Sequence, residues 1–221
     1  MNSRAEWLKE RMKGIGGSYA AAVLGLSQYQ SMVDVWEYKT GKREQEDISN
    51  KPVVMKGIQA EPLMIAMFAL DYPEFNIEAK PFDIIWSDKT PFLYATLDAR
   101  LIELETGKRG VYEGKRAEVR NKAAFDAWGS WDAESREFNK QIPYIYYVQC
   151  LHQLYVTGWD FVILRARIYT QWNDTFIERN YRMDKTDDNV MRDTPDIIAK
   201  EIEFWTKYVV ANVRPPLDLG L

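Results

Sequence analysis

Alternating apolar and polar residues predict a sheet made largely of two hairpins. Apolar positions repeat every second residue on both sides of a polar turn at residues 105–110, which predicts a hairpin over residues 92–117. A second hairpin is predicted over residues 159–169 and 175–183, and residues 75–86 form a further strand region. Helical spacing of apolar residues surrounds these strands, so the fold class is α/β, with a central mixed sheet flanked by helices.

Helices are predicted where apolar residues recur at three- or four-residue spacing between capping residues. The predicted segments are residues 3–13, 19–24, 32–40, 53–71, 121–128, 133–140 and 144–157, and a C-terminal helix starting at 184–188. Ser18 and Ser31 are the expected N-caps, and Gly25, Gly41 and Gly158 are the expected helix ends.

Two prolines are expected to interrupt helices, Pro62 in the fourth and Pro195 in the last. The inward face of the C-terminal helix is expected to be apolar and to consist of Ile197, Ile198, Ile202, Trp205 and Val209. No repeat, linker or low-complexity tract divides the chain, so we expect a single domain over residues 1–221.

Composition restricts the kind of metal site that the chain can build. The sequence contains 221 residues, of which 46% are hydrophobic, and it has one cysteine and one histidine. This excludes an internal disulfide framework, a Cys/His zinc site and a four-cysteine iron–sulfur cluster. Any metal must be held mainly by oxygen ligands, which favours Mg²⁺, with Mn²⁺ as a substitute. Cys150 is expected on a buried helix face.

Charge and hydropathy bear on partners and location. The formal net charge of −4 argues against a general nucleic-acid coat protein, although an enzyme can confine basic residues to one channel. No apolar run reaches the ~20 residues that a membrane span needs, and the N-terminus lacks the apolar segment of a secretory signal. We therefore expect a cytoplasmic protein without a membrane partner.

Asp98, Glu113 and Lys115 are expected to meet on one face of the first hairpin. With a turn centred on residues 106–107, Asp98 lies opposite Lys115, and residues two apart share a face of a strand. Two crowded carboxylates beside an ammonium require an outside charge, and a divalent cation is the simplest one. This pattern is typical of metal-dependent phosphodiesterases of the PD-(D/E)xK type, and a solvated hairpin edge is the alternative.

Residues 14–18 read Gly-Ile-Gly-Gly-Ser and lead into a short alanine-rich helix. Free backbone N–H groups at such a helix start can hold a phosphate, whereas a tight interhelical turn is the plainer interpretation. Glu61 lies on an apolar helix, where a carboxylate either faces solvent or is held by a partner.

Three further features carry open interpretations. On helix 144–157 a polar stripe consists of Gln149, His152 and Gln153, where Gln149 can hold a phosphate and His152 is interpreted as a satisfied core residue. The apolar run 53–55 is interpreted as core, with a wedge between terminal base pairs as the alternative. Candidate contacts to a DNA backbone follow Lys115, or form an exposed charged loop: Arg116, Arg120 and Lys122.

Taken together, these motifs resemble the lambda-exonuclease-like (YqaJ) family of viral recombination nucleases. The matching stretches occur in family order: GIGGSYAAAVLGLSQY, GIQAEP, ATLDARL, YEGK and IPYIYYVQCLHQLYVTG. With Arg11 they span residues 11–158. The resemblance implies a restriction-endonuclease-like core and Mg²⁺-dependent, processive 5′→3′ digestion of one strand of linear double-stranded DNA. It also implies a homotrimeric ring, a single-strand annealing partner, and a phage or prophage gene expressed in a bacterial host.

The resemblance assigns the metal site to particular residues. Asp98, Glu113 and Glu61 correspond to the metal-binding carboxylates, and the Gly114 carbonyl is an added ligand. Lys115 corresponds to the residue that orients or activates the attacking water.

It also assigns residues that bind the DNA strand. Gln149 matches the glutamine of the last family motif, and Arg11 and Ser18 match the pair that grips the 5′-terminal phosphate. Tyr19 departs from the family, which often has an acidic residue at this position.

Two other functions fit parts of the pattern. One is a structure-specific or endonucleolytic PD-(D/E)xK nuclease, although the missing cysteines argue against the CRISPR-associated kind that carries an iron–sulfur cluster. The other is a catalytically silent protein that binds DNA ends, against which the complete set of acids and lysine argues.

Overall fold

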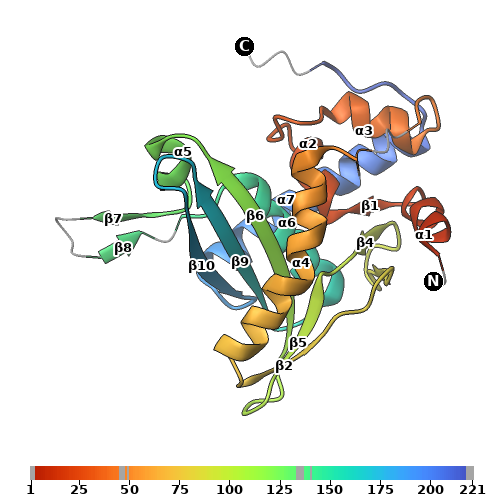
Figure 1. Cartoon of the computed structure of the whole chain (residues 1–221). Coiled ribbons are helices and arrows are strands. Elements are labelled where there is room, and N and C mark those ends of the chain that lie inside the picture. The colour runs from red at the N-terminus through yellow and green to blue at the C-terminus, as the bar shows by residue number, and fades with distance from the viewer. Residues whose placement is uncertain (1–2, 45–47, 49, 133–136, 140, 218–221) are drawn as a thin grey trace.

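The computed structural model describes residues 3–44, 48, 50–132, 137–139 and 141–217. At its centre lies a five-stranded sheet with the order β10-β9-β6-β5-β2 (Figure 1). The strands are β2 (Phe75–Glu78), β5 (Ala99–Glu103), β6 (Arg109–Val119), β9 (Phe161–Thr170) and β10 (Thr175–Asp184). β6 and β9 run parallel and the other neighbours antiparallel, which confirms the predicted mixed sheet.

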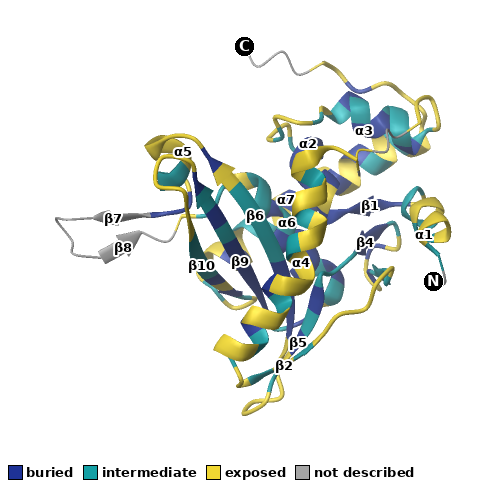
Figure 2. Ribbon diagram, viewed as in Figure 1, coloured by how far each residue is buried: buried dark blue, intermediate teal, exposed yellow. Residues whose placement is uncertain are grey.

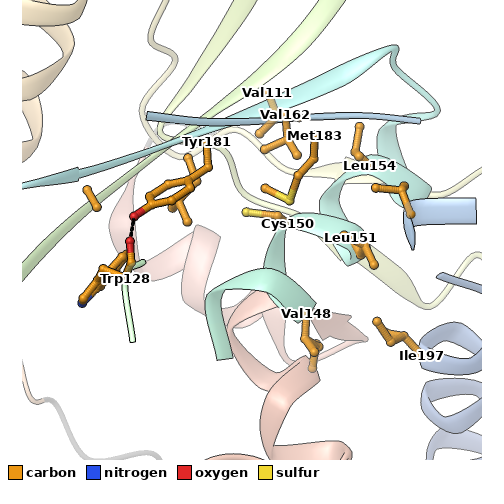
Figure 3. Close-up of a cluster of buried hydrophobic side chains, with 14 of the residues drawn as sticks. Val111, Trp128, Val148, Cys150, Leu151, Leu154, Val162, Tyr181, Met183 and Ile197 are labelled. Carbon is orange, nitrogen blue, oxygen red and sulfur yellow. Dashed lines mark hydrogen bonds between the residues drawn. The ribbon is translucent and has the colours of Figure 1, made fainter. Parts of the chain in front are cut away.

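Helices cover both faces of this sheet (Figure 1). α6 (Tyr144–Thr157) and α7 (Asp188–Phe204) pack on one face, and α4 (Pro52–Asp71) crosses the other. The larger hydrophobic core lies beneath α6, where Cys150 and Leu151 pack with strand residues such as Val162 (Figure 3). A second core lies around α2 (Gly17–Val23), α3 (Met32–Lys39) and β4 (Leu93–Ala95) and includes Ile15, Val35 and Leu93. A third, smaller core lies beneath α4, where Phe68 and Tyr112 contact each other with ring centroids 5.0 Å apart.

The N-terminal segment joins a small second sheet. α1 (Arg4–Arg11) leads through β1 (Ile15–Gly16) into α2 (Gly17–Val23), followed by α3 (Met32–Lys39). β1 pairs in parallel with β4 (Leu93–Ala95), which also pairs with β3 (Ile85–Trp86). A Cβ atom at Gly16 would lie 2.5 Å from the Tyr94 ring, so this close strand pairing requires glycine. The remaining elements are α5 (Lys122–Asp126), β7 (Ser130–Asp132), β8 (Glu137–Asn139) and a π-helical turn (Trp205–Val210).

Several sequence-based predictions are confirmed. α6 has the predicted bounds and ends at Gly158, whose φ of 64° is the left-handed cap that glycine favours. Ser31 caps α3 in a capping box with Asp34, and the second hairpin and the buried Cys150 are as expected.

The first hairpin has a different register from the predicted one. The Glu103 N–H donates to the Lys108 carbonyl (2.9 Å), so the turn centres one residue earlier than expected. Ala99 pairs with Tyr112, and the expected pairing of Asp98 with Lys115 is wrong. Moving the turn centre by one residue changes the partner of every residue across the hairpin by two positions. Because side chains alternate with a period of two, each side chain keeps its predicted face of the sheet.

Other strand and helix predictions fail where tertiary pairing overrides local pattern. Residues 75–86 do not form one strand region, since β2 and β3 belong to different sheets. The predicted helix 133–140 is wrong at Glu137–Asn139, which pairs with β7 instead, and residues 133–136 and 140 lie outside the described residues. α4 and α7 continue through their prolines. Buried residues lie on both sides of Pro195 in α7, whereas in α4 the buried residues, Met64 and Phe68, follow Pro62.

Two individual residues also differ from expectation. Ser18 is not an N-cap but lies in the first turn of α2, because the pairing of β1 with β4 holds Gly16 extended as the cap. Ile202 was expected on the inward face of α7, but it is exposed, whereas Ile197 and Ile198 are buried.

The outer face of α4 is exposed (Figure 2), and it carries apolar side chains. Val53, Leu63 and Leu70 are 67%, 67% and 82% exposed, so the interpretation of residues 53–55 as core is wrong. Within the described part of the chain, α4 is the one helix that is long and apolar enough, by length and composition only, to cross a membrane. Met64 and Phe68 on its inner face are buried in the protein core.

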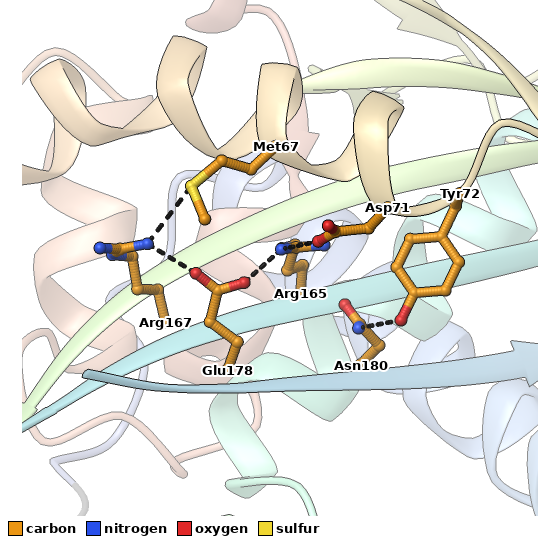
Figure 4. A network of polar contacts seen from close by, with 7 residues as sticks. All are labelled: Met67, Asp71, Tyr72, Arg165, Arg167, Glu178 and Asn180. Carbon is orange, nitrogen blue, oxygen red and sulfur yellow. Dashed lines mark hydrogen bonds and ion pairs between the residues drawn. The ribbon is translucent and has the colours of Figure 1, made fainter.

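A buried arginine fixes the C-terminal end of α4 to the sheet (Figure 4). Arg165 of β9 is 1% exposed and forms ion pairs with Asp71 of α4, at 2.7 Å, and with Glu178 of β10. Glu178 also accepts from Arg167 (2.6 Å), and Tyr72 accepts from Asn180 (2.7 Å). This network fixes the position of the helix that carries Glu61.

Candidate active site

Four charged side chains gather where α4, β5 and β6 meet α6, and we refer to them as the acidic cluster: Glu61, Asp98, Glu113 and Lys115. Asp98 directly precedes β5, and its Oδ2 accepts a hydrogen bond from the Gly114 N–H of β6 (2.8 Å). The corrected hairpin register thus still brings the predicted acids and lysine together, because the side chains kept their faces.

Glu113 is the most constrained member of the acidic cluster. Its side chain is 3% exposed and forms an ion pair with Lys115. From α6, the Gln149 amide donates to Glu113 Oε1 (2.7 Å) and the Gln153 amide donates to Oε2 (2.6 Å). Both carboxylate oxygens of Glu113 are therefore held by neutral amides, which satisfy the buried charge without cancelling it.

The carboxylates of the acidic cluster repel one another. Burial, followed by the charges of Glu113 and Glu61, raises the pKa of Asp98 well above its usual value, although Lys115 opposes this. Burial and the charge of Glu113 also raise the pKa of Glu61, although its side chain reaches solvent. Burial lowers the pKa of Lys115, but Glu113 and Asp98 outweigh this and raise it. The lysine is therefore a protonated donor in this arrangement.

This donor set fits a hard divalent cation by its chemistry. Asp98, Glu113 and Glu61 supply oxygen ligands and share excess negative charge, which a bound cation would relieve. Among the residues described, no three His, Cys, Asp or Glu side chains are already arranged as ligands of a common ion. A cation bound by Glu113 would compete with Lys115 for the same carboxylate.

A second polar group, the basic cluster, lies between α1, α2, α3 and β4 and consists of Arg11, Ser18, Tyr19, Lys39 and Tyr94. Arg11 Nη2 donates to Ser18 Oγ (3.3 Å), and Arg11 Nε donates to the Tyr94 hydroxyl (3.2 Å). Burial raises the pKa of Tyr94 to about 12, so this hydroxyl accepts as a neutral group. The pair Arg11 and Ser18, seven residues apart in sequence, is thus brought into contact.

Lys39 extends the basic cluster from α3. It is 9% exposed, its Nζ donates to the Arg11 carbonyl (2.8 Å), and it lies 4.2 Å from the centre of the Tyr19 ring. Burial and the charge of Arg11 lower the pKa of Lys39 to about 7.

α6 lies beside both clusters. A Cβ atom at Gly17 would lie 3.2 Å from Gln149 Cγ, so the residue next to Ser18 packs against the glutamine that holds Glu113. His152, one turn further, is fully buried between the Tyr94 carbonyl (2.8 Å) and the Glu201 carboxylate (2.9 Å). The interpretation of His152 as a satisfied core histidine is confirmed.

The three basic residues after Lys115 do not form one continuous positive surface. Arg116 is half-buried and points to the other face of the sheet, where it lies over the Phe176 ring. Lys122 forms an ion pair with Asp126 (2.7 Å), and Arg120 is exposed.

Sequence reasoning missed Lys39, Tyr94 and the contact of Gln153 with Glu113. A signal was present for Lys39, because it lies four residues after the apolar Val35 and therefore shares a helix face with it. No sequence pattern identifies Tyr94, since its role depends on the pairing of β1 with β4.

Comparison with known proteins identifies the family. The sequence matches the model of the YqaJ-like viral recombinase domain over residues 6–160. The chain belongs to the YqaJ-like viral recombinase family. All four members of the acidic cluster, together with Arg11, Ser18 and Gln149, lie within the matched YqaJ-like region.

Among curated relatives, the chain is 29% identical over 234 residues to the uncharacterized protein YqaJ of Bacillus subtilis (strain 168). This alignment covers 98% of the chain and 60% of the relative, so the chain spans about 60% of the length of that protein.

Solved structures confirm the restriction-endonuclease-like fold class of this YqaJ-like chain. The alkaline exonuclease LHK-Exo of Laribacter hongkongensis superposes with a TM-score of 0.63 at 14% identity, over 95% of this chain and 94% of that one. A complex of LHK-Exo with dAMP gives the same TM-score of 0.63. A phage-related exonuclease of Haemophilus somnus 129PT superposes with a TM-score of 0.52 at 9% identity, over 90% of this chain and 96% of that one.

Proposed function

We propose that this chain is a Mg²⁺-dependent exonuclease that degrades one strand of linear double-stranded DNA from 5′ to 3′. The 3′ single-stranded tails would then serve recombination by strand annealing. The observation that carries this proposal is the acidic cluster, in which a buried glutamate is held by two amides next to a lysine and a second carboxylate. Membership of the viral recombinase family and the description of the superposed proteins as exonucleases support it.

Asp98, Glu113 and Glu61, with the Gly114 carbonyl, are the residues that would hold Mg²⁺, for which Mn²⁺ is expected to substitute. The cation would lower the pKa of a water and neutralise charge that develops on the scissile phosphate.

Lys115 and Gln149 act next to these ligands. Lys115 would hydrogen-bond the attacking water, or act as the base if the charge of a bound cation lowers its pKa. The uncharged Gln149 amide holds Glu113, and its Cγ lies next to Gly17.

Arg11 and Ser18 would hold the 5′-terminal phosphate. A guanidinium that already donates to the Ser18 hydroxyl can redirect its N–H groups to phosphate oxygens, which it binds in bidentate fashion. Since Gln149 touches both Glu113 and Gly17, a strand end held here lies near the acidic cluster. Contacts of Arg116, Arg120 and Lys122 with the DNA backbone remain part of the proposal.

We further propose that the working form is a homotrimeric ring with a single-strand annealing partner. The exposed apolar residues of α4 support an assembly, because exposed apolar surface often marks a site of protein–protein contact. A ring also allows an acidic chain to enclose DNA with basic residues turned inward. Sedimentation should show a trimer, and a monomer at working concentration would contradict this part.

The decisive experiment uses linear duplexes with 5′-phosphate or 5′-hydroxyl ends, incubated in Mg²⁺ or in chelator. Labels on each strand end report polarity on a denaturing gel. Loss of the 5′ end of one strand, in Mg²⁺ only, is expected. Cleavage of covalently closed circles would instead identify an endonuclease, and binding without cleavage would identify a silent end-binding protein.

Lys115→Ala tests the chemistry separately from DNA binding. Cleavage should be abolished while duplex affinity is retained, since the lysine acts on water. Lys207→Ala removes an exposed lysine that pairs with Glu203 and serves as the control. Cleavage at the wild-type rate by Lys115→Ala would remove the lysine from the mechanism.

A further inference from the structure

Lys39 has an environment that a purely structural lysine does not need. Its side chain is buried, and within the described part of the chain no carboxylate lies within 4 Å of its Nζ. The groups around it are Arg11 of α1, Tyr19 of α2 and Tyr94 of β4, and the charge that acts on its pKa is a second cation, the Arg11 guanidinium. A buried ammonium beside another cation is unfavourable unless an anion arrives.

The neighbours of Lys39 are the residues proposed to hold the DNA end. The Arg11 carbonyl accepts from Lys39 Nζ, while the guanidinium of the same residue donates to Ser18 and Tyr94. The Tyr19 ring lies against both cations, 4.2 Å from Lys39 Nζ and 6.0 Å from Arg11 Cζ. A terminal phosphate carries a charge of about −1.5 to −2 at pH 7, whereas Arg11 supplies only one positive charge.

From this geometry we propose that Lys39 is the second, proton-linked cation of the 5′-phosphate site and determines preference for a phosphorylated end. This rests on the proposed exonuclease function. Lys39 loses much of its charge in the free protein near neutral pH and takes up a proton when the phosphate binds. It acts through its charge and through the Arg11 carbonyl, and is therefore a positioning residue rather than a catalytic one.

The proposed role of Lys39 predicts how the affinity for a 5′-phosphorylated end changes with pH. Burial and Arg11 lower the pKa of Lys39 to about 7, and a bound dianion raises it again. Between the pKa of Lys39 in the free protein and its higher pKa in the complex, each unit of increase in pH reduces the affinity for the phosphorylated end by up to about tenfold. Below about pH 6 the phosphate itself becomes protonated, so preference should peak near pH 6.5–7.

The test measures binding without cleavage, by fluorescence anisotropy of 5′-phosphate and 5′-hydroxyl duplexes in EDTA from pH 6 to 9. The readout is the ratio of the two dissociation constants. Wild type should prefer the phosphate at pH 7 and lose that preference towards pH 9. Lys39→Met keeps the apolar stem, and should reduce the ratio roughly tenfold at pH 7 and flatten its pH profile.

Lys42→Met is the matched control, since Lys42 follows α3 in an exposed turn and lies over the Trp36 ring. It removes the same charge and should leave both the ratio and its pH profile unchanged. If wild type shows no preference at any pH, the proposed phosphate site itself is wrong. If wild type prefers the phosphate equally from pH 7 to 9, or Lys39→Met keeps the wild-type ratio and profile, only the role of Lys39 is rejected. The wild-type profile decides the question even if Lys39→Met does not fold.

Discussion

The acidic and basic clusters have unbalanced charge of opposite sign. In the acidic cluster three carboxylates share one ammonium, and burial together with their repulsion raises the pKa of Asp98 and of Glu61. In the basic cluster, Arg11 and Lys39 have no carboxylate within 4 Å among the residues described, and their repulsion helps to lower the pKa of Lys39.

The difference indicates what each region is built to receive. Elsewhere in the structure buried charges are neutralised internally, as Arg165 is by Asp71 and Glu178. The two clusters lack such neutralisation, so one suits a cation and the other an anion. A phosphodiester substrate with its metal supplies both charges, and α6 lies next to both regions.

The largest effect is expected from removing one charge of the acidic cluster. Glu113→Gln should reduce cleavage by about 10³-fold or more, because it removes a central proposed metal ligand without changing shape. Calorimetry should show weaker Mn²⁺ binding by the same variant. Glu203→Gln, an exposed glutamate paired with Lys207, is the control. Unchanged cleavage would mean that the excess charge does not serve a metal.

The corresponding change in the basic cluster is Arg11→Ala. The preference for 5′-phosphorylated over 5′-hydroxyl ends should fall about 10- to 100-fold, because a bidentate charged donor is lost. Cleavage rates on both substrates measure the ratio, and Arg192→Ala, an exposed arginine paired with Asp193, is the control. An unaltered ratio would reject the basic cluster as the phosphate site.

A smaller effect is expected from the amides that hold Glu113. Gln153→Leu leaves Glu113 Oε2 without its donor and should weaken Mn²⁺ binding about tenfold, as is typical of residues that support metal ligands. Gln171→Leu removes the same kind of bond, since the Gln171 amide donates to Glu118 Oε1 (2.6 Å) in an exposed turn. Equal affinity in both variants would show that Gln153 serves only packing.

The smallest effect concerns His152, which joins α6 to β4 and α7. Burial lowers the pKa of His152, but Glu201 and the Tyr94 carbonyl outweigh this and raise it above 6.5. Its stabilising contribution is therefore fully present below pH 6.5 and lost as pH rises through the raised pKa. Urea unfolding should show that wild type loses more of its free energy of unfolding between pH 6 and pH 9 than His152→Gln does. Parallel pH profiles would exclude protonation of His152 as a source of stability.

Local patterns predicted much of the fold. The bounds of α6, the cap of α3 and the second hairpin depend on periodicity and on capping residues that lie next to one another in sequence. The face on which Glu113 and Lys115 lie was also predictable, because strand alternation survives a register error of two residues.

By itself the sequence determined the acids, the lysine and their shared strand face, because these depend on chain-local geometry. Only the tertiary structure decided how their charges are compensated. The amides that hold Glu113 come from α6, and Lys39 and Tyr94 reach Arg11 from α3 and β4. Such contacts join residues far apart in the chain. Burial and charge neutralisation depend on which elements pack together, and no local pattern specifies that.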